Sequence, residues 1–313
     1  MIALIVRRAI QLIFLLLGIS FLVFSSMYIA PGDPATMVGG PTATESDLVA
    51  IRDNLGLNDP FLVQYGRYLG HAVQGDFGYS YQSKQSVSEA IAVRFPNTLK
   101  LAVASMIVAI IIGIIAGLIS ALKHNSWLDV TSTTVALAGI SIPNFWLGAI
   151  LILVFAVNLQ WLPVAGLSDP FYTWEGIKQL ILPAITLGTG SAAMIARMTR
   201  SSILEVVKAD YVRTARAKGV KEKNVIWIHT LKNAMIPVIT VIGLNFGALL
   251  GGTIITEKVF AINGVGRLMI DAIAMRDFPM VQASVLLVAT LFVVVNLVVD
   301  IVYTMIDPRI NYE

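Results

Sequence analysis

The sequence predicts an all-α integral membrane protein with six transmembrane helices, and its composition supports that fold class. Hydrophobic residues fill 57% of the 313 positions and charged residues only 13%, against about 25% charged in a typical soluble protein. The mean hydropathy is +0.79. The apolar residues come in runs of about 20, the length that crosses a bilayer, and lack the amphipathic spacing of a soluble core. A large soluble domain is therefore excluded.

Six hydrophobic segments are long enough to be spans. Arg7 and Arg8 precede the first, whose apolar run exceeds the roughly 7–15 residues of a signal-peptide core and lacks a small-x-small cleavage site. We therefore expect it to remain as an uncleaved first span. The predicted spans cover residues 9–30, 100–122, 134–157, 180–197, 234–256 and 281–305.

The positions of Lys and Arg predict that both termini are cytoplasmic, because cytoplasmic loops are enriched in these residues. With the N-terminus inside, the inner segments carry Arg7, Arg8, Lys123, Arg309 and nine basic residues between 197 and 232. The short outer loops carry only Lys178, Lys258, Arg267 and Arg276. The first outer loop also contains basic residues, but long loops translocate largely regardless of their charge.

The first outer loop, residues 31–99, contains its own signals for where helices end and turns occur. Pro31-Gly32-Asp33-Pro34 must end the first helix, because proline has no backbone N–H to donate and disfavours a helical backbone at the residue before it. We expect a helix over Thr44–Leu55 before a turn at 56–60, and a second helix from Gln64 to Val73. A loop this long is usually functional. Two interpretations stay open: a solvated cap, and a docking surface for an external partner.

The fourth and fifth spans differ from lipid-facing helices. The fifth carries Gly243, Gly247 and Gly251, and small residues at this spacing allow close helix packing in lipid. The fourth is rich in Ala, Gly, Ser and Thr. We expect both spans to face protein or a translocation pathway, with Asn245 as a polar pathway candidate; ordinary helix packing is the alternative. The second span carries one similar glycine pair, at 113 and 117.

The sequence lacks the motifs that several other functions require. Gly70–Gly75 has the glycine spacing of a phosphate-binding loop, but Lys and Ser/Thr do not follow it, so the chain is predicted to hold neither ATP nor magnesium. The three His residues are scattered, there is no Cys, and we expect no metal site. Ser141 has no nearby general base for protease chemistry. The chain is therefore predicted not to be an enzyme.

Ion-coupled transport and nucleic-acid binding also find little support. Few ionisable residues fall inside the spans, and Asp300 lies near the inner end of the last one, so no buried proton or sodium relay is predicted. The net charge of +3 reflects Lys and Arg gathered at the membrane-facing loops, and predicts no nucleic-acid partner. An ion-coupled secondary transporter remains the alternative class.

The most informative segment is the basic loop between the fourth and fifth spans. Ser202–Lys218 is expected to be helical, with Gly219 at the position where a helix ends in a left-handed conformation. A second helix is expected from Glu222 into the fifth span. An amphipathic helix resting on lipid headgroups would need only the basic residues. Asp210 and Tyr211 favour a docking surface for another protein.

At these residues the chain resembles a known family. Arg213-Thr214-Ala215-x-x-x-Gly219 is similar to the EAA loop of binding-protein-dependent ABC importer permeases. Asp210–Gly219 followed by His229-x-Leu-x-Asn233-Ala234-x-x-Pro237 resembles the variant of dipeptide, oligopeptide and nickel permeases. Further segments resemble that subfamily: Pro31–Pro34, Leu55–Leu57, Gly75-Asp76-Phe77-Gly78-x-Ser80, Arg197-x-x-Arg200-Ser201-Ser202, Glu257-x-x-Phe260, Gly264-x-Gly266, Arg276-Asp277-x-Pro279 and Asp307-Pro308-Arg309. Ile262-Asn263-Gly264 departs from the Trp-Pro-Gly common in relatives.

The resemblance implies a permease subunit in the cytoplasmic membrane of a bacterium or archaeon. Its expected partners are a second homologous permease, two cytoplasmic P-loop ATPases that carry the ATP and magnesium, an external solute-binding protein and the lipid bilayer. It implies four parts: residues 1–30 with the first span, the loop 31–99, a core over 100–305 that contains the coupling loop 198–233, and the tail 306–313.

The resemblance also implies a role for the basic loop as a coupling helix inserted into a groove on one ATPase. The residues expected to make that contact are Asp210, Tyr211, Arg213, Thr214, Ala215, Arg216, Lys218, Gly219 and Val220. Ala215 and Gly219 would permit close approach, and the basic side chains would contact the groove rim. Short peptides are the preferred substrate, with glutathione and a nickel chelate as alternatives.

Overall fold

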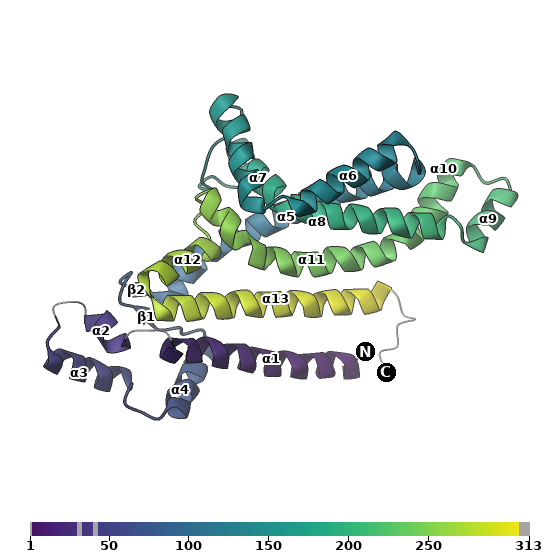
Figure 1. Cartoon of the computed structure of the whole chain (residues 1–313). Helices are drawn as coiled ribbons and strands as arrows, with labels where there is room; N and C mark the ends of the chain where they lie inside the picture. The colour runs from purple at the N-terminus through teal and green to yellow at the C-terminus, as the bar shows by residue number, and fades with distance from the viewer. Residues whose placement is uncertain (1, 30–32, 40–42, 307–313) are drawn as a thin grey trace. The chain divides into compact units, whose positions relative to one another are not determined.

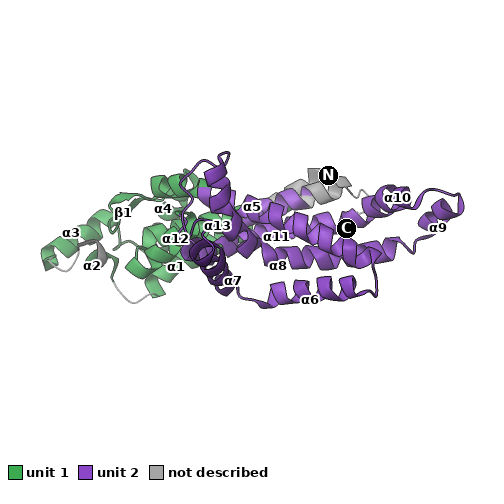
Figure 2. Ribbon diagram, turned by 90° about the horizontal axis from the view of Figure 1, so that it is seen from above, with its two compact units in different colours: residues 1–96, 263–291 green, residues 97–262, 292–313 purple. Residues whose placement is uncertain are grey.

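The apolar runs of the sequence form long helices. The structure is a computed structural model that describes residues 2–29, 33–39 and 43–306 (Figure 1). Within these residues, five helices are long and apolar enough to cross a membrane, or six if one bent helix pair counts as a single span. The chain forms two compact units, 1–96 with 263–291 and 97–262 with 292–313, shown in green and purple in Figure 2.

The first unit contains most of the predicted outer loop. Its elements are α1 (Ile2–Ile29), α2 (Pro34–Gly39), α3 (Glu45–Leu55), α4 (Phe61–Val73), the antiparallel strands β1 (Tyr79–Ser80) and β2 (Gln85–Ser86), the start of α5 (Val87–Leu122), α12 (Val265–Met275) and the start of α13 (Phe278–Ile306). Pro31 and Gly32 of the predicted helix break lie outside the described residues. The chain resumes with Pro34 at the first position of α2, where a missing donor costs nothing.

Local signals explain where α3 and α4 begin and end. Thr44 and Asp47 form a capping box at the start of α3, and Gly56 ends that helix with φ +63°. The helix therefore lies where the sequence predicts it. The second helix begins at Phe61, three residues before the expected Gln64, because Pro60 sets the extended backbone that precedes it.

Aromatic side chains join α1 to α4. Phe24 of α1 lies 5.4 Å from Phe61 and 5.6 Å from Tyr65, measured between ring centroids. Tyr28 donates a hydrogen bond to Gln64. Such rings bury large apolar areas and prefer these tilted and edge-on arrangements, so the two helices hold each other by packing as well as by hydrogen bonding.

Besides the short α2, two helical segments of the first unit differ from what the sequence predicts. Helix α5 begins at Val87, although the sequence assigns residues up to 99 to the outer loop. Glu89, Arg94 and Pro96 lower the hydropathy of these turns without ending the helix. Helix α12 was also missed. Buried side chains from the start of α5, from α12 and from the start of α13 form the core here: Val87, Ala90, Ile91, Val265, Ala272, Met280 and Ala283.

The second unit is a helical core with one projecting loop. It contains the rest of α5 and α13, together with α6 (Trp127–Ser141), α7 (Asn144–Leu151), the π-helix η1 (Ile152–Asn158), α8 (Trp174–Val206), α9 (Asp210–Ala217), α10 (Glu222–Asn224), the π-helix η2 (Val225–Leu231) and α11 (Lys232–Val259). Helix α8 packs most extensively against α11, and buried residues of α5, α8 and α11 make the main core.

The third predicted span, 134–157, is not one straight helix. The helix pair α6 and α7–η1 passes the span criteria only together, and it bends by 106° at the break. Pro143 has no N–H to donate and holds Ile142 in an extended conformation at ψ 124°. The hydrophobic run hides this break, since mostly apolar residues precede and follow the segment Ser141-Ile142-Pro143-Asn144.

Helices α5 and α8 approach each other at small residues. A Cβ added to Gly113 would lie 2.8 Å from the carbonyl oxygen of Ala192, and one added to Gly117 would lie 2.5 Å from that of Ala196. Both distances are too short for a real Cβ atom. The glycine pair of the second predicted span therefore permits backbone contact of the kind that small residues allow between helices in lipid.

Candidate functional site: the α8–α11 loop and its surroundings

The loop between α8 and α11 contains a break that the sequence did not predict. Helix α8 ends at Val206, and Ala209 has an extended backbone at ψ 145° before α9 begins at Asp210. The expected single helix over Ser202–Lys218 is therefore wrong, and two helices replace it. Asp210 stands in the first turn of α9, where a negative charge stabilises the N-terminal end of the helix dipole.

Gly219 and the segment after it lie as the sequence predicts. Gly219 follows the last residues of α9 with φ +77°, a conformation that costs other L-residues energy. A Cβ there would meet no described atom within 4 Å, so the requirement for glycine comes from the backbone alone. The second helix starts at Glu222 and continues through η2 into α11. In Figure 1 the loop projects at the end of α8 and α11.

Helix α9 has a buried face and an exposed face. Val212 and Ala215 are buried, and α9 packs against η2. The small side chain of Ala215 thus allows α9 to pack closely within its own loop. From the sequence alone, Ala215 was instead expected to allow close approach of a partner protein. The other predicted contact residues are exposed: Asp210, Tyr211, Arg213, Thr214, Arg216, Lys218 and Gly219; Val220 is half-buried.

Two polar contacts hold α9 in place. Arg216 Nη2 donates to Glu222 Oε1 at 2.7 Å, which raises the pKa of the Arg216 guanidinium. Asn233 Nδ2 donates to the Tyr211 hydroxyl at 3.0 Å. These contacts fix both ends of the short helix. Arg213 forms only a long, exposed pair with Asp210 at 3.7 Å, and exposed pairs of this kind contribute little, so its guanidinium stays available to a partner.

A buried carboxylate lies where the α5–α6 turn meets α8. Arg200 of α8 reaches Asp129 of α6 with Nε at 2.8 Å and Nη2 at 2.9 Å. Asp129 also accepts hydrogen bonds from the Ser120 hydroxyl and the Asn125 backbone, and its carboxylate lies 3.0 Å from His124 Nδ1. In the sequence analysis Arg200 appears only as part of a motif, and Asp129 does not appear at all.

The N-cap Ser126 three residues before Asp129 signals the start of α6. No local signal connects it to Arg200. A second carboxylate, Glu257 of α11, is fully buried and accepts a hydrogen bond from Thr98 at 2.7 Å. The side chain of Asp300, the one acidic candidate of the last predicted span, lies outside the described part of the chain.

The three glycines of the fifth predicted span have different surroundings in α11. A Cβ on Gly243 would lie 2.5 Å from Val299 of α13, and one on Gly247 would lie 3.4 Å from Asn296. At Gly251 no described atom lies within 4 Å of that position. The regular spacing therefore does not mark one continuous helix contact, because only Gly243 is in a place that a side chain cannot occupy.

A groove of about 590 Å³ lies between α8 and α11. Met194, Arg197 and Ser201 line it from α8, and Leu244, Asn245 and Ala248 line it from α11. Asn245 Nδ2 donates to the Val241 carbonyl at 2.8 Å, so the amide oxygen remains as an acceptor. The groove brings the predicted pathway residue Asn245 together with Arg197, which the sequence placed in the basic loop.

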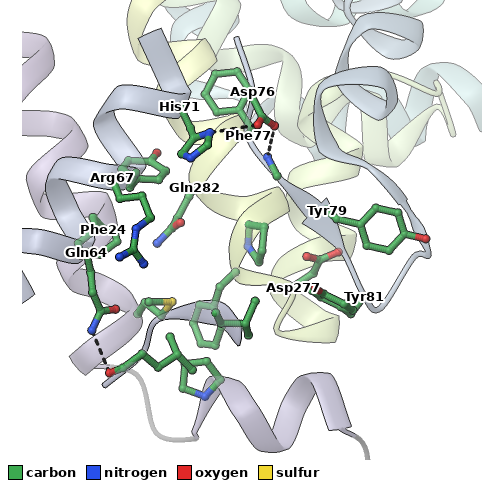
Figure 3. Close-up of a pocket in the computed structure, with 18 of the residues that line it drawn as sticks. Phe24, Gln64, Arg67, His71, Asp76, Phe77, Tyr79, Tyr81, Asp277 and Gln282 are labelled. Carbon is green, nitrogen blue, oxygen red and sulfur yellow. Dashed lines mark hydrogen bonds and ion pairs between the residues drawn. The ribbon is translucent and has the colours of Figure 1, made fainter. Parts of the chain in front are cut away.

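The first unit contains a separate cavity of about 380 Å³. Aromatic rings line much of it, and Figure 3 shows Arg67, His71 and Gln282 around it. His71 Nδ1 lies 3.2 Å from Asp76 Oδ2. Burial raises the pKa of the Tyr68 phenol to about 12, with a smaller contribution from Tyr65. The Tyr68 hydroxyl therefore stays protonated at any physiological pH.

Two sequence motifs far apart in the chain meet at this cavity. Ser80, which closes the motif that starts at Gly75, donates a hydrogen bond to Asp277. Both side chains are buried, and Asp277 also accepts from the Met280 backbone. Within the described residues, no group of three or more His, Cys, Asp or Glu side chains could hold a metal ion.

Comparisons with known proteins give consistent matches along the chain. A family model described as a binding-protein-dependent transport system inner membrane component matches residues 109–312, and a model of the N-terminal part of such components matches residues 1–102. The glutathione transport system permease GsiC of Escherichia coli strain K12 is 47% identical over 309 residues, 99% of each chain. GsiC of Salmonella paratyphi A is 46% identical over the same lengths.

A solved structure shows the same fold at lower identity. An inward-facing conformation of the MetNI methionine ABC transporter matches with a TM-score of 0.57 and 19% identity, over 69% of this chain and 95% of that chain. At this identity the likeness concerns the arrangement of helices alone.

Proposed function

This chain belongs to the family of binding-protein-dependent transport system inner membrane components, and from that premise we propose that it forms half of the pathway of an importer for short peptides of the glutathione class. As a member of that family it is a permease of an ABC importer and a multi-pass inner-membrane protein of the bacterial type. The observation that supports the substrate class is 47% identity to a glutathione permease over 99% of both chains.

The proposed assembly has four further subunits and a carrier-dependent cycle. A second homologous permease completes the pathway, two P-loop ATPases hold the ATP and magnesium, and a solute-binding protein delivers the peptide. The described chain offers no three-residue acidic or histidine metal cluster, and its Gly70–Gly75 segment lacks the Lys and Ser/Thr of a phosphate-binding loop. In this proposal the partner ATPases supply the energy for import.

We propose that α9 couples the permease to an ATPase. This role requires the loop to be cytoplasmic, which is the side that the positions of Lys and Arg predict. The support for this role is the combination of a fixed backbone and an exposed charged face. Arg213 in the middle of α9 and Lys218 just after its last residue are exposed, and Tyr211 and Arg216 hold the helix against the rest of the loop. A rigid helix of this kind can transmit the closure of an ATPase dimer to α8 and α11, the helices that flank the loop.

The first unit is proposed to face the solute-binding protein. Leu62 and Val73 of α4 are 71% and 81% exposed, and a bound protein that covered them would remove their apolar surface from water.

The test is purification in mild detergent followed by reconstitution. A tagged chain should recover a P-loop ATPase, a second permease and a binding protein from its native membrane. The reconstituted complex should accumulate glutathione or a short peptide only with ATP on the ATPase side and with the binding protein present. A chain that purifies alone and moves a solute along an ion gradient would instead support the secondary-transporter alternative.

A further inference from the structure

Arg197 occupies an unusual position on the face of a membrane-spanning helix. It lies nine residues before the end of α8 at Val206, which is roughly 14 Å along the helix at about 1.5 Å per residue. Its side chain is exposed, and its guanidinium contacts the Met194 sulfur at 2.9 Å. Thioether sulfur is a weak acceptor, so this contact leaves most of the donors of Arg197 unused.

Arg197 and Arg200 have different surroundings although they lie on the same helix. Arg200, three residues further on the same helix, is neutralised by Asp129. Arg197 forms no ion pair with any residue that the structure describes. Arg197 is the last residue of the fourth predicted span, 180–197, and a charged side chain near the end of a span is most stable when it faces water, a protein cavity or an anion. The groove between α8 and α11 is the cavity that it lines.

The groove has the chemistry to hold a peptide by both of its polar ends. A guanidinium presents a planar pair of N–H donors that match the two oxygens of a carboxylate. The amide oxygen of Asn245 is an acceptor for an ammonium or amide N–H, while its amide nitrogen donates one of its two N–H groups to the Val241 carbonyl. Leu244 and Met194 supply apolar walls. A volume of about 590 Å³ is within the range of ligand pockets.

We propose that the α8–α11 groove is a transient binding site for the carboxylate of the transported peptide, with Arg197 as the residue that selects for that charge. This site rests on the proposed import function and extends it, because it places part of the substrate selectivity in the permease as well as in the binding protein. The site is expected to bind weakly, since a groove open on one side leaves the ion pair in contact with water.

The experiment uses the reconstituted complex with its binding protein and compares each transported peptide with its C-terminal amide. The affinity of the binding protein for both forms is measured separately, so that uptake can be normalised to delivery. R197Q should lower uptake of the free acid by about fivefold, the upper limit for a solvent-exposed ion pair, while uptake of the amide changes less than twofold. R197K keeps the charge without the planar fork and should fall between R197Q and the unchanged complex.

Two further variants keep the test decisive. K178Q removes a positive charge from the start of the same helix, where Lys178 lies over the Trp174 ring, and should leave the ratio of acid to amide uptake unchanged. N245D places a carboxylate in the groove without removing Arg197, and should lower uptake of the acid more than that of the amide. It tests the site even if R197Q fails to insert.

The experiment tests the import function and the Arg197 site separately. ATP-dependent uptake by the unchanged complex tests the import function by itself. The proposal for Arg197 is overturned if R197Q and N245D both leave the acid-to-amide ratio at the value of the unchanged complex, whether total uptake falls or not. Binding-protein-stimulated ATP hydrolysis, which should stay within twofold in all four variants, shows that coupling is intact.

Discussion

Arg200 donates two hydrogen bonds to the buried carboxylate of Asp129, and so joins α8 to the start of α6. The two residues are 71 positions apart in the chain. The Asp129 side chain is only 6% exposed and that of Arg200 is 30% exposed. Because α8 leads directly into the α9 loop, this pair fixes the helix on which movement of the loop would act.

Removing either member of this pair should destabilise the chain. R200Q leaves a buried carboxylate without its charged partner, and breaking a buried ion pair in this way costs about 3–5 kcal/mol. D129N should cost less, because it removes the buried negative charge and its one amide oxygen can still accept from either Ser120 or Asn125. The measurement is the thermal midpoint of the detergent-solubilised protein. The double variant R200Q/D129N should be more stable than R200Q alone, and simple additivity of the two losses would contradict the pairing.

Gly219 should be needed for coupling and not for insertion. G219V forces a β-branched residue to φ +77°, where such residues are genuine outliers, and should cost about 1–2 kcal/mol locally. The last turn of α9 would shift as a result. Uptake should fall to background, while the amount of protein in the membrane stays normal. G219N is the matched control, because Asn tolerates the left-handed conformation. Normal uptake by G219V would exclude a rigid coupling role for this turn.

The α5–α8 contact gives a test that compares two glycines. G117A places a methyl group 2.5 Å from the Ala196 carbonyl and 2.6 Å from Thr199 Cβ, so the helices must separate. We expect a loss of about 1–3 kcal/mol, as for other overpacked interiors. G190A changes a glycine of α8 that has no described atom within 4 Å of its added Cβ, and should be neutral or slightly stabilising. Equal thermal midpoints for the two variants would contradict the close contact.

The Ser80–Asp277 hydrogen bond should hold the hairpin of the first unit in place. S80A removes the donor and leaves Asp277 buried without it, which costs about 1–3 kcal/mol. Hydrogen exchange of the backbone amides around 79–86 should become faster, while exchange in the α9 loop stays unchanged. S46A is a suitable control, since Ser46 is exposed on α3. Exchange rates in the hairpin that match those of S46A would show that the bond does not matter.

The sequence predicts the parts of this fold that depend on local signals. The long apolar runs, the capping box at Thr44 and the left-handed Gly219 each involve neighbouring residues, so each could be identified without the structure. Pro143 is also a local signal, but the apolar residues around it made a single span seem sufficient. The break at Ala209 was missed for a related reason, because α8 and α9 share the composition of a good helix.

Contacts between distant segments could not be predicted in the same way. Gly113 and Gly117 of α5 lie against the α8 backbone, whereas Gly243, Gly247 and Gly251 of α11 have three different surroundings although their spacing is as regular. Small residues show that a close approach is possible and not which neighbour makes it. The pairing of Asp129 with Arg200 and the meeting of Ser80 with Asp277 likewise depend on tertiary structure.

The coupling role requires that α9 docks directly on an ATPase. The chain contains no cysteine, so T214C creates a single thiol on the exposed face of α9 for a photo-crosslinker. S168C serves as the control, because Ser168 is exposed just before the opposite end of α8, a helix of 33 residues that spans roughly 50 Å. We predict that T214C crosslinks to the ATPase in the assembled complex and that S168C does not. Crosslinking of T214C to lipid alone, or equal crosslinking of both positions to the ATPase, would contradict the coupling role of α9.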